Sequence, residues 1–439
     1  MTAIETLSKK IADRSAAIGV IGLGYVGLPV AALFAQAGFR VIGVDTKQER
    51  IAVINAGNSP IEGDEPGLPA LLADVVSAGG FHATADYEAL RKAEIVLISV
   101  ETPVNEDHIP AYKAMKGALR SLGAVMQAGT LVVVESTVMP GTMAHIAKTL
   151  LEETSGMTCG KDFYLGNCPE RVMPGKLLRN LRTMNRVAGG DSPQIARMVR
   201  DLYNSFVEAE IDTTDWITAE IVKTAENAYR DVQIAFANEV ALICEGLGAD
   251  VWRVRELVRK SPGREMLQPG AGVGGHCIPK DPWLLASSVK DLDVPIRLIP
   301  TAREINAGMP RHMMNLLKKV LHDLRGKKIL LLGYAYLQNS DDTRNSPSAA
   351  LAESLAAEGA EVAVHDPFVA EYRGDVYEAA RGCDAAVLVT AHDAYGEIDL
   401  KKFGSILKDA IILDGRNLFD SAQARAADVG LVRLGNPIR

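Results

Sequence analysis

Residues 22–27, which read GLGYVG, limit the fold of this chain more than any other stretch. They follow an apolar run, Ala17–Ile21, and they open an apolar stretch that continues to Ala37. A second apolar run, Arg40–Val44, then ends in Asp45, about 20 residues after the first glycine, as the dinucleotide fingerprint requires. A strand, a glycine turn, a helix and a strand with a terminal acidic residue together predict a dinucleotide-binding βαβ unit.

Each glycine of this motif has a physical role in such a unit. Gly22 allows the tight turn, Gly24 lets the backbone reach a pyrophosphate on the helix N-terminus, and Gly27 lets helix and strand pack closely. Asp45 would accept hydrogen bonds from both ribose hydroxyls, and its charge would repel a 2′-phosphate. We therefore expect NAD rather than NADP as the cofactor. An ordinary strand–turn–helix with incidental glycines is the alternative, and the context of the motif disfavours it.

Three further apolar runs end in polar residues at predicted strand ends. The runs at 94–100 and 130–134 lead into ETP and ESTVMPG, and the run at 163–166 leads into NCPERVMPGK. Ligands of open parallel sheets bind beyond the carboxyl ends of the strands, so we expect Thr102 and Thr137 near the cofactor. Glu170 and Arg171 would face the same crevice, although a surface ion pair between them is the better interpretation of these two residues alone.

Composition bounds the rest of the chain. Its 439 residues are 48% hydrophobic and 23% charged, which allows two or three domains with large cores. The formal net charge of −8 and the lack of a lysine-rich tract give no reason to expect nucleic-acid binding. Residues 1–17 lack an apolar core, and no apolar run approaches the ~20 residues of a spanning helix. We expect a cytoplasmic protein without nucleic-acid or membrane partners.

A long stretch without proline, 215–248, predicts a central helix that joins two domains. Lys223, Asn227 and Arg230 lie at i, i+4 and i+7 and therefore form one polar stripe. A solvated face would give the same pattern on a surface helix. We expect this helix to be buried on most sides, and buried polar groups of this kind need a ligand or a network to satisfy them.

The second half of the chain repeats the strand pattern of the first. Its apolar runs lie at 328–332, 361–364, 385–389 and 411–413. The first run ends in Gly333 alone, where the first half has three glycines, so we do not expect a dinucleotide here. Arg344 and Arg416 lie near strand ends and suit a phosphorylated ligand. The predicted fold class is α/β, with two Rossmann-like doubly wound parallel-sheet domains joined by a long central helix.

Residues 270–282, GAGVGGHCIPKDP, bring a run of glycines up to Cys277, with Lys280 and Asp281 directly behind it. Glycines gather in this way where backbone must approach a ligand closely or take a positive φ. A thiolate attacks carbon once a neighbouring base or cation lowers its pKa, so Cys277 is a candidate nucleophile. A buried, inert thiol is the alternative. The five cysteines include no CxxC pair and indicate neither a disulfide framework nor a metal site.

Six motifs resemble those of the UDP-glucose/GDP-mannose dehydrogenase family over nearly the whole chain: GLGYVG, ESTV, CPERVMPG, KxxENxxR, GVGGHC followed by KD, and DDTRNSP. The resemblance implies NAD-dependent oxidation of the C6 alcohol of a nucleotide sugar to a carboxylate, in a homodimer or higher homo-oligomer built on the long helix. It implies an NAD-binding domain over 1–212, a central helical dimerisation and catalytic segment over 213–310, and a UDP-sugar-binding domain over 311–439.

By position, the resemblance implies that Cys277 forms a thiohemiacetal and then a thioester with C6. Lys223 and Asn227 would stabilise the oxyanion, which is most effective where water is excluded. The groups implied to order the base and water, and to act as the base for thioester hydrolysis, are Asp281, Thr137 and Glu170.

The resemblance also implies two sets of binding residues and no metal ligands. The cofactor set is Gly22, Gly24, Tyr25, Val26, Gly27, Asp45, Arg50, Thr102, Thr137 and Arg344. The set for the UDP-sugar is Glu170, Arg171, Val172, Lys223, Asn227, Arg230, Arg264, Gly274, Tyr336 and Arg416, with Arg264 assigned to the neighbouring subunit's site.

Within the family, CPERVMPG and the run after Lys223 resemble the branch that acts on UDP-N-acetyl amino sugars, especially UDP-N-acetyl-D-mannosamine, in surface-polysaccharide precursor synthesis. UDP-N-acetylglucosamine and UDP-glucose stay open as substrates. A non-catalytic NAD-binding protein and a two-electron alcohol dehydrogenase are the alternatives of another class. Neither needs a nucleophilic cysteine accompanied by Lys223 and Asp281, so the pattern favours the nucleotide-sugar enzyme.

Overall fold

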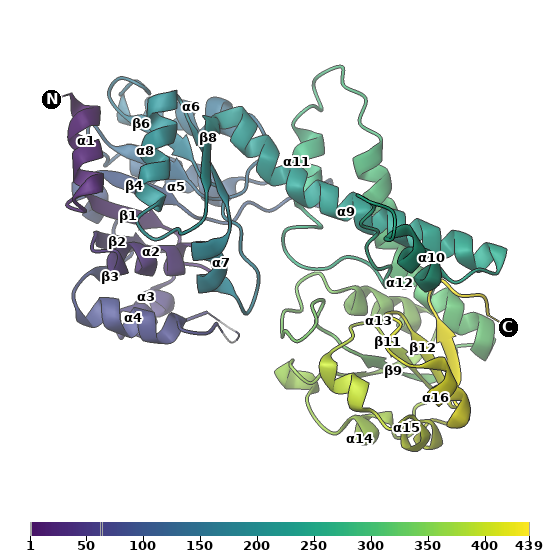
Figure 1. Ribbon diagram of the computed structural model, residues 1–439. Coiled ribbons are helices and arrows are strands. Elements are labelled where there is room, and N and C mark those ends of the chain that lie inside the picture. The colour runs from purple at the N-terminus through teal and green to yellow at the C-terminus, as the bar shows by residue number, and fades with distance from the viewer. Residues whose placement is uncertain (1, 62, 64, 439) are drawn as a thin grey trace. The chain divides into compact units, whose positions relative to one another are not determined.

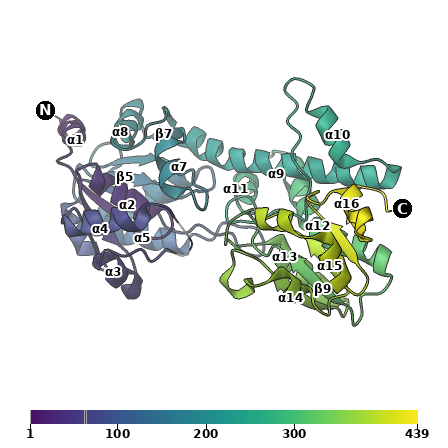
Figure 2. The same cartoon turned by 60° about the horizontal axis from the view of Figure 1, so that its bottom comes forward.

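The computed structural model describes residues 2–61, 63 and 65–438. The chain divides into two compact units (Figures 1 and 2). Unit 1 is Met1–Glu226 with Trp283–Asp293, and unit 2 is Asn227–Pro282 with Val294–Arg439. The helix α9, Trp216–Leu247, is continuous across this division and confirms the predicted long helix. Among the described residues no helix is both long and apolar enough to cross a membrane.

Unit 1 is built on an eight-stranded sheet, counted over the described residues, with the order β3-β2-β1-β4-β5-β6-β7-β8. Its strands are β1 Ala17–Ile21, β2 Arg40–Val44, β3 Phe81–Thr84, β4 Ile95–Ile98, β5 Leu131–Val134, β6 Tyr164–Asn167, β7 Arg186–Gly190 and β8 Ile211–Asp215. The sequence predicted five of these strands and missed β3, β7 and β8. The pairing is parallel except between β6 and β7, which run antiparallel, so the sheet is mostly rather than wholly parallel.

Alternation along the strands explains why these runs are apolar throughout. In β4, Ile95 and Leu97 belong to the core on one face of the sheet, and Val96 and Ile98 belong to the core on the other. Successive side chains of a strand point to opposite faces, so a strand covered on both faces needs apolar residues at every position. Helices therefore cover both faces of this sheet.

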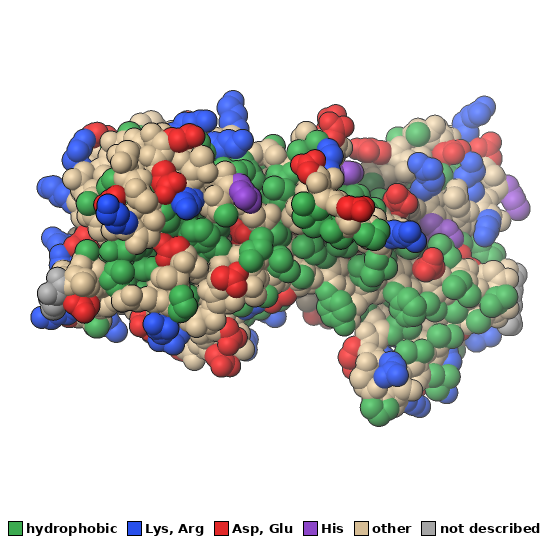
Figure 3. Space-filling model, turned by 90° about the horizontal axis from the view of Figure 1, so that it is seen from above, with side chains coloured by type: hydrophobic (Ala, Val, Ile, Leu, Met, Phe, Trp, Pro, Cys, Tyr) green, Lys and Arg blue, Asp and Glu red, His purple; other side chains and the backbone are tan. Residues whose placement is uncertain are grey.

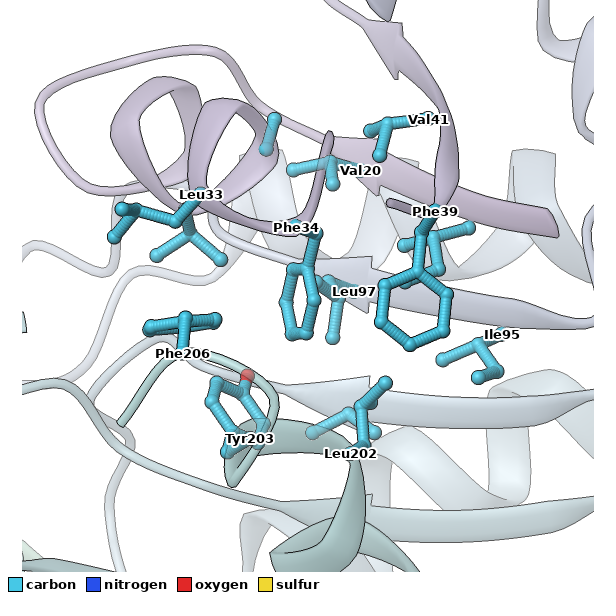
Figure 4. Packing of buried hydrophobic residues seen from close by; sticks show 14 of the residues in the cluster. Val20, Leu33, Phe34, Phe39, Val41, Ile95, Leu97, Leu202, Tyr203 and Phe206 are labelled. Atoms are coloured by element: carbon cyan, nitrogen blue, oxygen red, sulfur yellow. The ribbon is translucent and has the colours of Figure 1, made fainter. Parts of the chain in front are cut away.

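The helices of the first 226 residues are α1 Ala3–Ala12, α2 Gly27–Gln36, α3 Gln48–Asn55, α4 Leu68–Ser77, α5 Lys113–Gly123, α6 Lys148–Ser155, α7 Leu177–Thr183 and α8 Pro193–Tyr203, with short helical turns at Tyr87–Lys92 and Met143–Ala147. Figure 4 shows the aromatic centre of one face, where Phe34 meets Phe39, Tyr203 and Phe206 edge to face. Phe34 of α2 and Phe206 lie with ring centroids 4.9 Å apart. The helix that opens at the glycine motif is thus anchored directly to the helix α8.

Unit 2 is built on a five-stranded parallel sheet, again over the described residues, with the order β10-β9-β11-β12-β13. The strands are β9 Lys328–Leu332, β10 Glu361–His365, β11 Ala385–Leu388, β12 Ile411–Asp414 and β13 Gly430–Arg433. The sequence predicted the first four and missed β13. Its helices, besides its part of α9, are α10 Val251–Val258, α12 Leu298–Leu321, α13 Pro347–Ala357, α14 Val376–Ala380, α15 Leu400–Ile406 and α16 Ser421–Ala426, with short turns at Ala370–Tyr372 and Asp393–Glu397. α12 and α13 cover one face of the sheet, and α14 and α15 cover the other (Figure 1). The predicted pair of Rossmann-like sheets is confirmed.

The expectation that α9 is buried on most sides is wrong for the single chain. Large apolar side chains of this helix are exposed, namely Ile217, Ile221, Tyr229, Phe236, Leu242, Ile243 and Leu247. Tyr229 is 66% exposed and Leu247 is 82% exposed. Figure 3 shows one face of the molecule with hydrophobic side chains at the surface. The buried face of the helix instead holds alanines such as Ala219 and Ala235, together with polar residues such as Lys223 and Asp231, and these large apolar residues lie outward.

Candidate active site

The loop between β1 and α2 has the geometry of a cradle for a pyrophosphate. Gly22 has φ +90°, and a Cβ there would lie 2.3 Å from the Ser99 carbonyl oxygen. A Cβ on Gly27 would lie 1.9 Å from the Gly22 carbonyl oxygen, so Gly27 is required by the turn itself and Gly22 by its φ and by the neighbouring strand end. A Cβ on Gly24 would meet nothing within 4 Å. Gly24 is therefore where the loop leaves room for a ligand at the start of α2.

Asp45 lies at the carboxyl end of β2 as an ionised, oriented acceptor. Its Oδ2 accepts hydrogen bonds from the Leu23 amide and from the Arg50 guanidinium, both at 2.9 Å, and its Oδ1 accepts one from the Lys47 amide at 2.9 Å. Burial alone would raise the pKa of Asp45, but these donors hold the pKa below its ordinary value. The glycine cradle and the carboxylate together fit NAD.

Thr102 and Thr137 come together beyond the ends of β4 and β5. The Thr102 hydroxyl donates to the Thr137 carbonyl oxygen at 2.6 Å, and both residues are buried. The structure therefore brings the two threonines to the same edge of the sheet as Gly24 and Asp45, as strand order requires.

In the segment after β6, the side chains of Glu170 and Arg171 contact different partners. Glu170 is buried, and its Oε1 lies 4.0 Å from the Lys223 ammonium of α9, which is also buried. Arg171 instead forms a two-pronged ion pair with Glu226. The interpretation of Glu170 and Arg171 as a surface ion pair is therefore wrong, because each has a different ionic neighbour on α9.

A buried polar cluster behind Glu170 was not predicted. Glu135 is fully buried at the end of β5, and its Oε1 accepts a hydrogen bond from the Tyr203 hydroxyl at 2.6 Å. The Arg186 guanidinium lies 5.1 Å from the centre of the Tyr203 ring. Burial raises the pKa of Glu135 to about 7, and the charge of Glu170 adds to the effect. The sequence shows Glu135 only as the first residue of ESTV, and this motif does not indicate that Tyr203 and Arg186 lie beside it.

Unit 2 holds the candidate nucleophile at a tight turn. The Cys277 carbonyl oxygen accepts hydrogen bonds from the amides of Lys280 at 3.1 Å and Asp281 at 2.8 Å. This turn starts α11, Asp281–Ser287. The Asp281 side chain is fully buried, accepts a hydrogen bond from Asn227 Nδ2 at 2.6 Å, and lies 3.4 Å from the Lys280 ammonium. The structure thus joins two predicted catalytic residues, Asn227 of α9 and Asp281, which lies four residues after the cysteine.

Arg344 and Tyr336 lie within electrostatic reach of Cys277. A hydrogen bond to Asp342 raises the pKa of Arg344, and a charge on Cys277 contributes in the same direction. Burial raises the pKa of Tyr336 to about 12, and Asp342 and Cys277 add to this shift. The Gly275 amide donates to the Arg344 carbonyl oxygen at 2.8 Å, which connects the two segments. The environment of the thiol therefore contains a guanidinium and a phenol.

The glycines before Cys277 make room for side chains of unit 2. Gly272 and Gly275 have φ of +132° and +91°. A Cβ on Gly274 would lie 2.4 Å from the Tyr336 Cβ, and one on Gly270 would lie 2.5 Å from an Arg416 guanidinium nitrogen. The expected positive φ is confirmed at Gly272 and Gly275, whereas Gly270 and Gly274 are required by close approach to Arg416 and Tyr336.

The remaining predicted binding residues have diverse surroundings. Arg230 and Arg264 are exposed in the chain, and Arg264 donates to the Pro262 carbonyl oxygen at 2.8 Å. Tyr25, Val26 and Val172 are partly buried and pack against one common core of unit 1.

Asp366 of unit 2 corresponds in position to Asp45, and its carboxylate is bound by groups of the protein. Asp366 follows β10 and is fully buried, and its Oδ2 accepts hydrogen bonds from the amides of Tyr334 and Ala335 and contacts His392 Nε2 at 3.0 Å. Its Oδ1 accepts from the amide of Phe368 at 2.8 Å. Asp45 has comparable amide donors, but Asp366 is also enclosed by the fully buried His392 ring.

The fold and the cofactor cradle define a Rossmann-type NAD-dependent dehydrogenase. Three family models match the chain: the UDP-glucose/GDP-mannose dehydrogenase family NAD binding domain at residues 16–207, its central domain at 217–308, and its UDP binding domain at 330–421. The chain belongs to the UDP-glucose/GDP-mannose dehydrogenase family and is an NAD-dependent dehydrogenase of nucleotide sugars. Family membership favours the catalytic interpretation over a binding-only protein.

One relative and two solved structures illustrate the similarity. A UDP-N-acetyl-D-mannosamine dehydrogenase of Pyrococcus horikoshii is 40% identical over 405 residues, which cover 91% of this chain and 95% of that protein. The solved structure of a UDP-D-ManNAc dehydrogenase from Pyrococcus horikoshii matches with a TM-score of 0.89 and 37% identity, over 95% of this chain and 99% of that one. The structure of NDP-N-acetyl-D-galactosaminuronic acid dehydrogenase from Methanosarcina mazei matches with a TM-score of 0.88 and 36% identity, over 100% of this chain and 98% of that one.

Proposed function

We propose that this protein oxidises C6 of UDP-N-acetyl-D-mannosamine to a carboxylate through a covalent adduct on Cys277, in the cytoplasmic synthesis of surface-polysaccharide precursors. The sugar is supported by relatives that carry this name at 33–40% identity. UDP-N-acetylglucosamine and UDP-glucose are the alternative substrates. We keep the proposed domain division of 1–212, 213–310 and 311–439.

The observation that carries the covalent mechanism is the turn that follows Cys277. It holds the fully buried Asp281 against Asn227 at 2.6 Å and near Lys280 at 3.4 Å. A charge on Cys277 contributes to the raised pKa of Arg344, and the same interaction would favour the thiolate. A cysteine that served only to fill space would need neither an oriented carboxylate nor a guanidinium beside it.

The covalent sequence balances as follows. NAD, when bound at the glycine cradle and Asp45, would supply the hydride acceptor for both oxidations of C6. The Cys277 thiol adds to the aldehyde carbon to form a thiohemiacetal, and loss of the C6 hydrogen from this sp³ carbon leaves a thioester. Water then breaks the carbon–sulfur bond, supplies the second carboxylate oxygen and returns the thiol to Cys277. Each oxidation step and the hydrolysis release a proton.

We assign the proton transfers and charge stabilisation to residues on α9 and on the segment after β6. Lys223 would stabilise the alkoxide, since a buried cation acts most strongly where water is excluded. Glu170, whose Oε1 lies 4.0 Å from Lys223, would take the proton of the hydrolytic water. Asn227 and Asp281 would orient the reacting groups at the cysteine, and Thr137 would order the water.

We also propose a homodimer in which the exposed apolar face of α9 is covered by a second copy. Exposed side chains as large as Tyr229, Phe236 and Ile243 on a single helix are unusual for an isolated soluble surface. Covering them in a dimer would remove these apolar side chains from water without changing the fold.

The test of the proposed function is the stoichiometry of NADH release. Limiting UDP-N-acetyl-D-mannosamine with excess NAD should give two NADH per sugar, because the aldehyde stays bound as an adduct. A parallel sample with an aldehyde-trapping amine should give the same count. One NADH per sugar, or aldehyde trapped in quantity, would contradict the covalent role of Cys277. Faster turnover of UDP-glucose or UDP-N-acetylglucosamine in the same assay would contradict the assigned sugar.

A further inference from the structure

The buried carboxylate of Glu65 joins two segments of unit 1 that are assigned to different ligands. Glu65 precedes α4 and is 7% exposed. Its Oε1 accepts hydrogen bonds from the Tyr25 hydroxyl and from the Gly175 amide, the latter at 2.9 Å. Its Oε2 accepts a hydrogen bond from the Leu177 amide at 3.1 Å. Tyr25 belongs to the NAD loop, and Gly175 and Leu177 end the segment that begins at Glu170.

These three donors leave the carboxylate little freedom. Leu177 is the first residue of α7 and is buried, so its amide has no access to water as a substitute acceptor. A buried amide that loses its acceptor is costly, and hydrogen bonds to an ionised acceptor are stronger than neutral ones. The arrangement in which Glu65 contacts both segments is therefore strongly preferred over one in which either segment moves alone.

Packing around Glu65 reinforces the connection. Tyr25, Val172 and Leu178 pack against the same hydrophobic core. Arg182 of α7 donates to Gln36 Oε1 of α2 at 2.5 Å, so the helix after the sugar segment is attached to the helix after the NAD loop. A displacement of one segment would therefore disturb contacts made by the other.

We propose that Glu65 is a positioning residue that couples cofactor binding to sugar-nucleotide binding. This inference rests on the proposed function, because it takes the segment 170–172 as a contact of the UDP-sugar. A cofactor that orders Tyr25 also orders Glu65 and the amides of Gly175 and Leu177. The entropy cost of ordering the sugar segment is then paid by NAD binding, so the UDP-sugar binds more tightly. Linkage requires the effect to be reciprocal, with each ligand tightening the other by the same factor.

The experiment measures this factor in the full-length chain with NADH and UDP-N-acetyl-D-mannosamine. Reduced cofactor and alcohol substrate cannot react, so the ternary complex is stable during titration. NADH fluorescence gives the Kd of NADH with and without saturating sugar nucleotide, and calorimetry gives the Kd of the sugar nucleotide alone. The variants are Tyr25→Phe, Glu65→Gln and the double variant. Tyr203→Phe is the matched control, because it removes another tyrosine–glutamate hydrogen bond of the same unit, at 2.6 Å from Glu135.

The sugar nucleotide should tighten NADH binding by at least about fivefold in the wild type and in Tyr203→Phe, the low end of typical coupling. The factor should fall toward one in Tyr25→Phe and Glu65→Gln, and the double variant should be no worse than the weaker single variant, because both changes break one connection. An equal factor in the wild type and both single variants, or a wild-type factor of one with both ligands bound, would overturn the role of Glu65. Failure of the wild type to bind the sugar nucleotide at all would overturn the proposed substrate as well.

Discussion

Replacement of Glu135 by glutamine should change how the stability of unit 1 depends on pH. Burial raises the pKa of Glu135 from its ordinary value of 4.5 to about 7. The charged and polar groups that face it are Tyr203, Arg186, Glu170 and Cys168; Tyr203 and Arg186 favour its ionised form, and Glu170 opposes it. The net shift shows that desolvation is the largest of these effects.

The sign follows from proton linkage. Between pH 4.5 and 7 the folded protein binds a proton at Glu135 that the unfolded chain has released, so the free energy of unfolding falls as pH rises through this window. Each pKa unit corresponds to about 1.4 kcal/mol, so the wild type should lose about 2–3 kcal/mol between pH 5 and pH 8 through this group. The amide of a glutamine side chain is neutral at every pH, and its oxygen would still accept the Tyr203 hydrogen bond, so Glu135→Gln should not show this loss.

Urea unfolding at pH 5 and pH 8 measures the difference. A Trp252→Phe background removes the one tryptophan of unit 2, so that Trp216 and Trp283 report on unit 1. The free energy of unfolding of the variant minus that of the wild type should be about 2–3 kcal/mol larger at pH 8 than at pH 5. This difference corresponds to roughly 5–10 °C in Tm for a unit of this size. Glu208→Gln, which removes an exposed carboxylate of the same unit, should show no such gain. Parallel pH dependences of the wild type and Glu135→Gln would refute the reasoning.

Three further predictions follow from the site and from α9. Because Asp45 is ionised and would face a 2′-phosphate, NAD should be preferred over NADP by at least about a hundredfold in kcat/KM, since two like charges 4 Å apart repel by about 4 kcal/mol at an effective dielectric of 20; equal efficiencies would contradict this. Cys277→Ser should lower net oxidation by at least about a thousandfold while calorimetry finds NAD and UDP-sugar affinities nearly unchanged, and lost binding would instead indicate a structural cysteine. Phe236→Asp, which places a charge on the exposed apolar face of α9, should convert the dimer into monomers in light scattering; a wild-type monomer, or an unaffected dimer, would exclude this interface.

The fold was largely predictable because its signals are local. Gly27 is required by a contact within its own turn, because an added Cβ would lie 1.9 Å from the Gly22 carbonyl oxygen, and Gly22 takes the positive φ that the turn needs. The strands covered on both faces, such as β4 and β9, read as unbroken apolar runs. β7 and β8 were missed because they carry polar or glycine residues, and β3 was missed because it is an edge strand with an exposed His82 and does not form an apolar run.

The sequence alone determined the two Rossmann-like sheets, the long helix and the residue types of the chemistry, because strand alternation, glycine turns and helix length depend on neighbours in the chain. The tertiary structure alone decided which of those residues meet. Glu170 lies beside Lys223 rather than Arg171, Glu135 is buried against Tyr203 and near Arg186, and Glu65 holds Tyr25 to Gly175. These contacts join residues tens to more than a hundred positions apart in the chain. The burial, the pKa and the hydrogen-bond partners of these glutamates are therefore set only when the order of the strands brings the strand ends together.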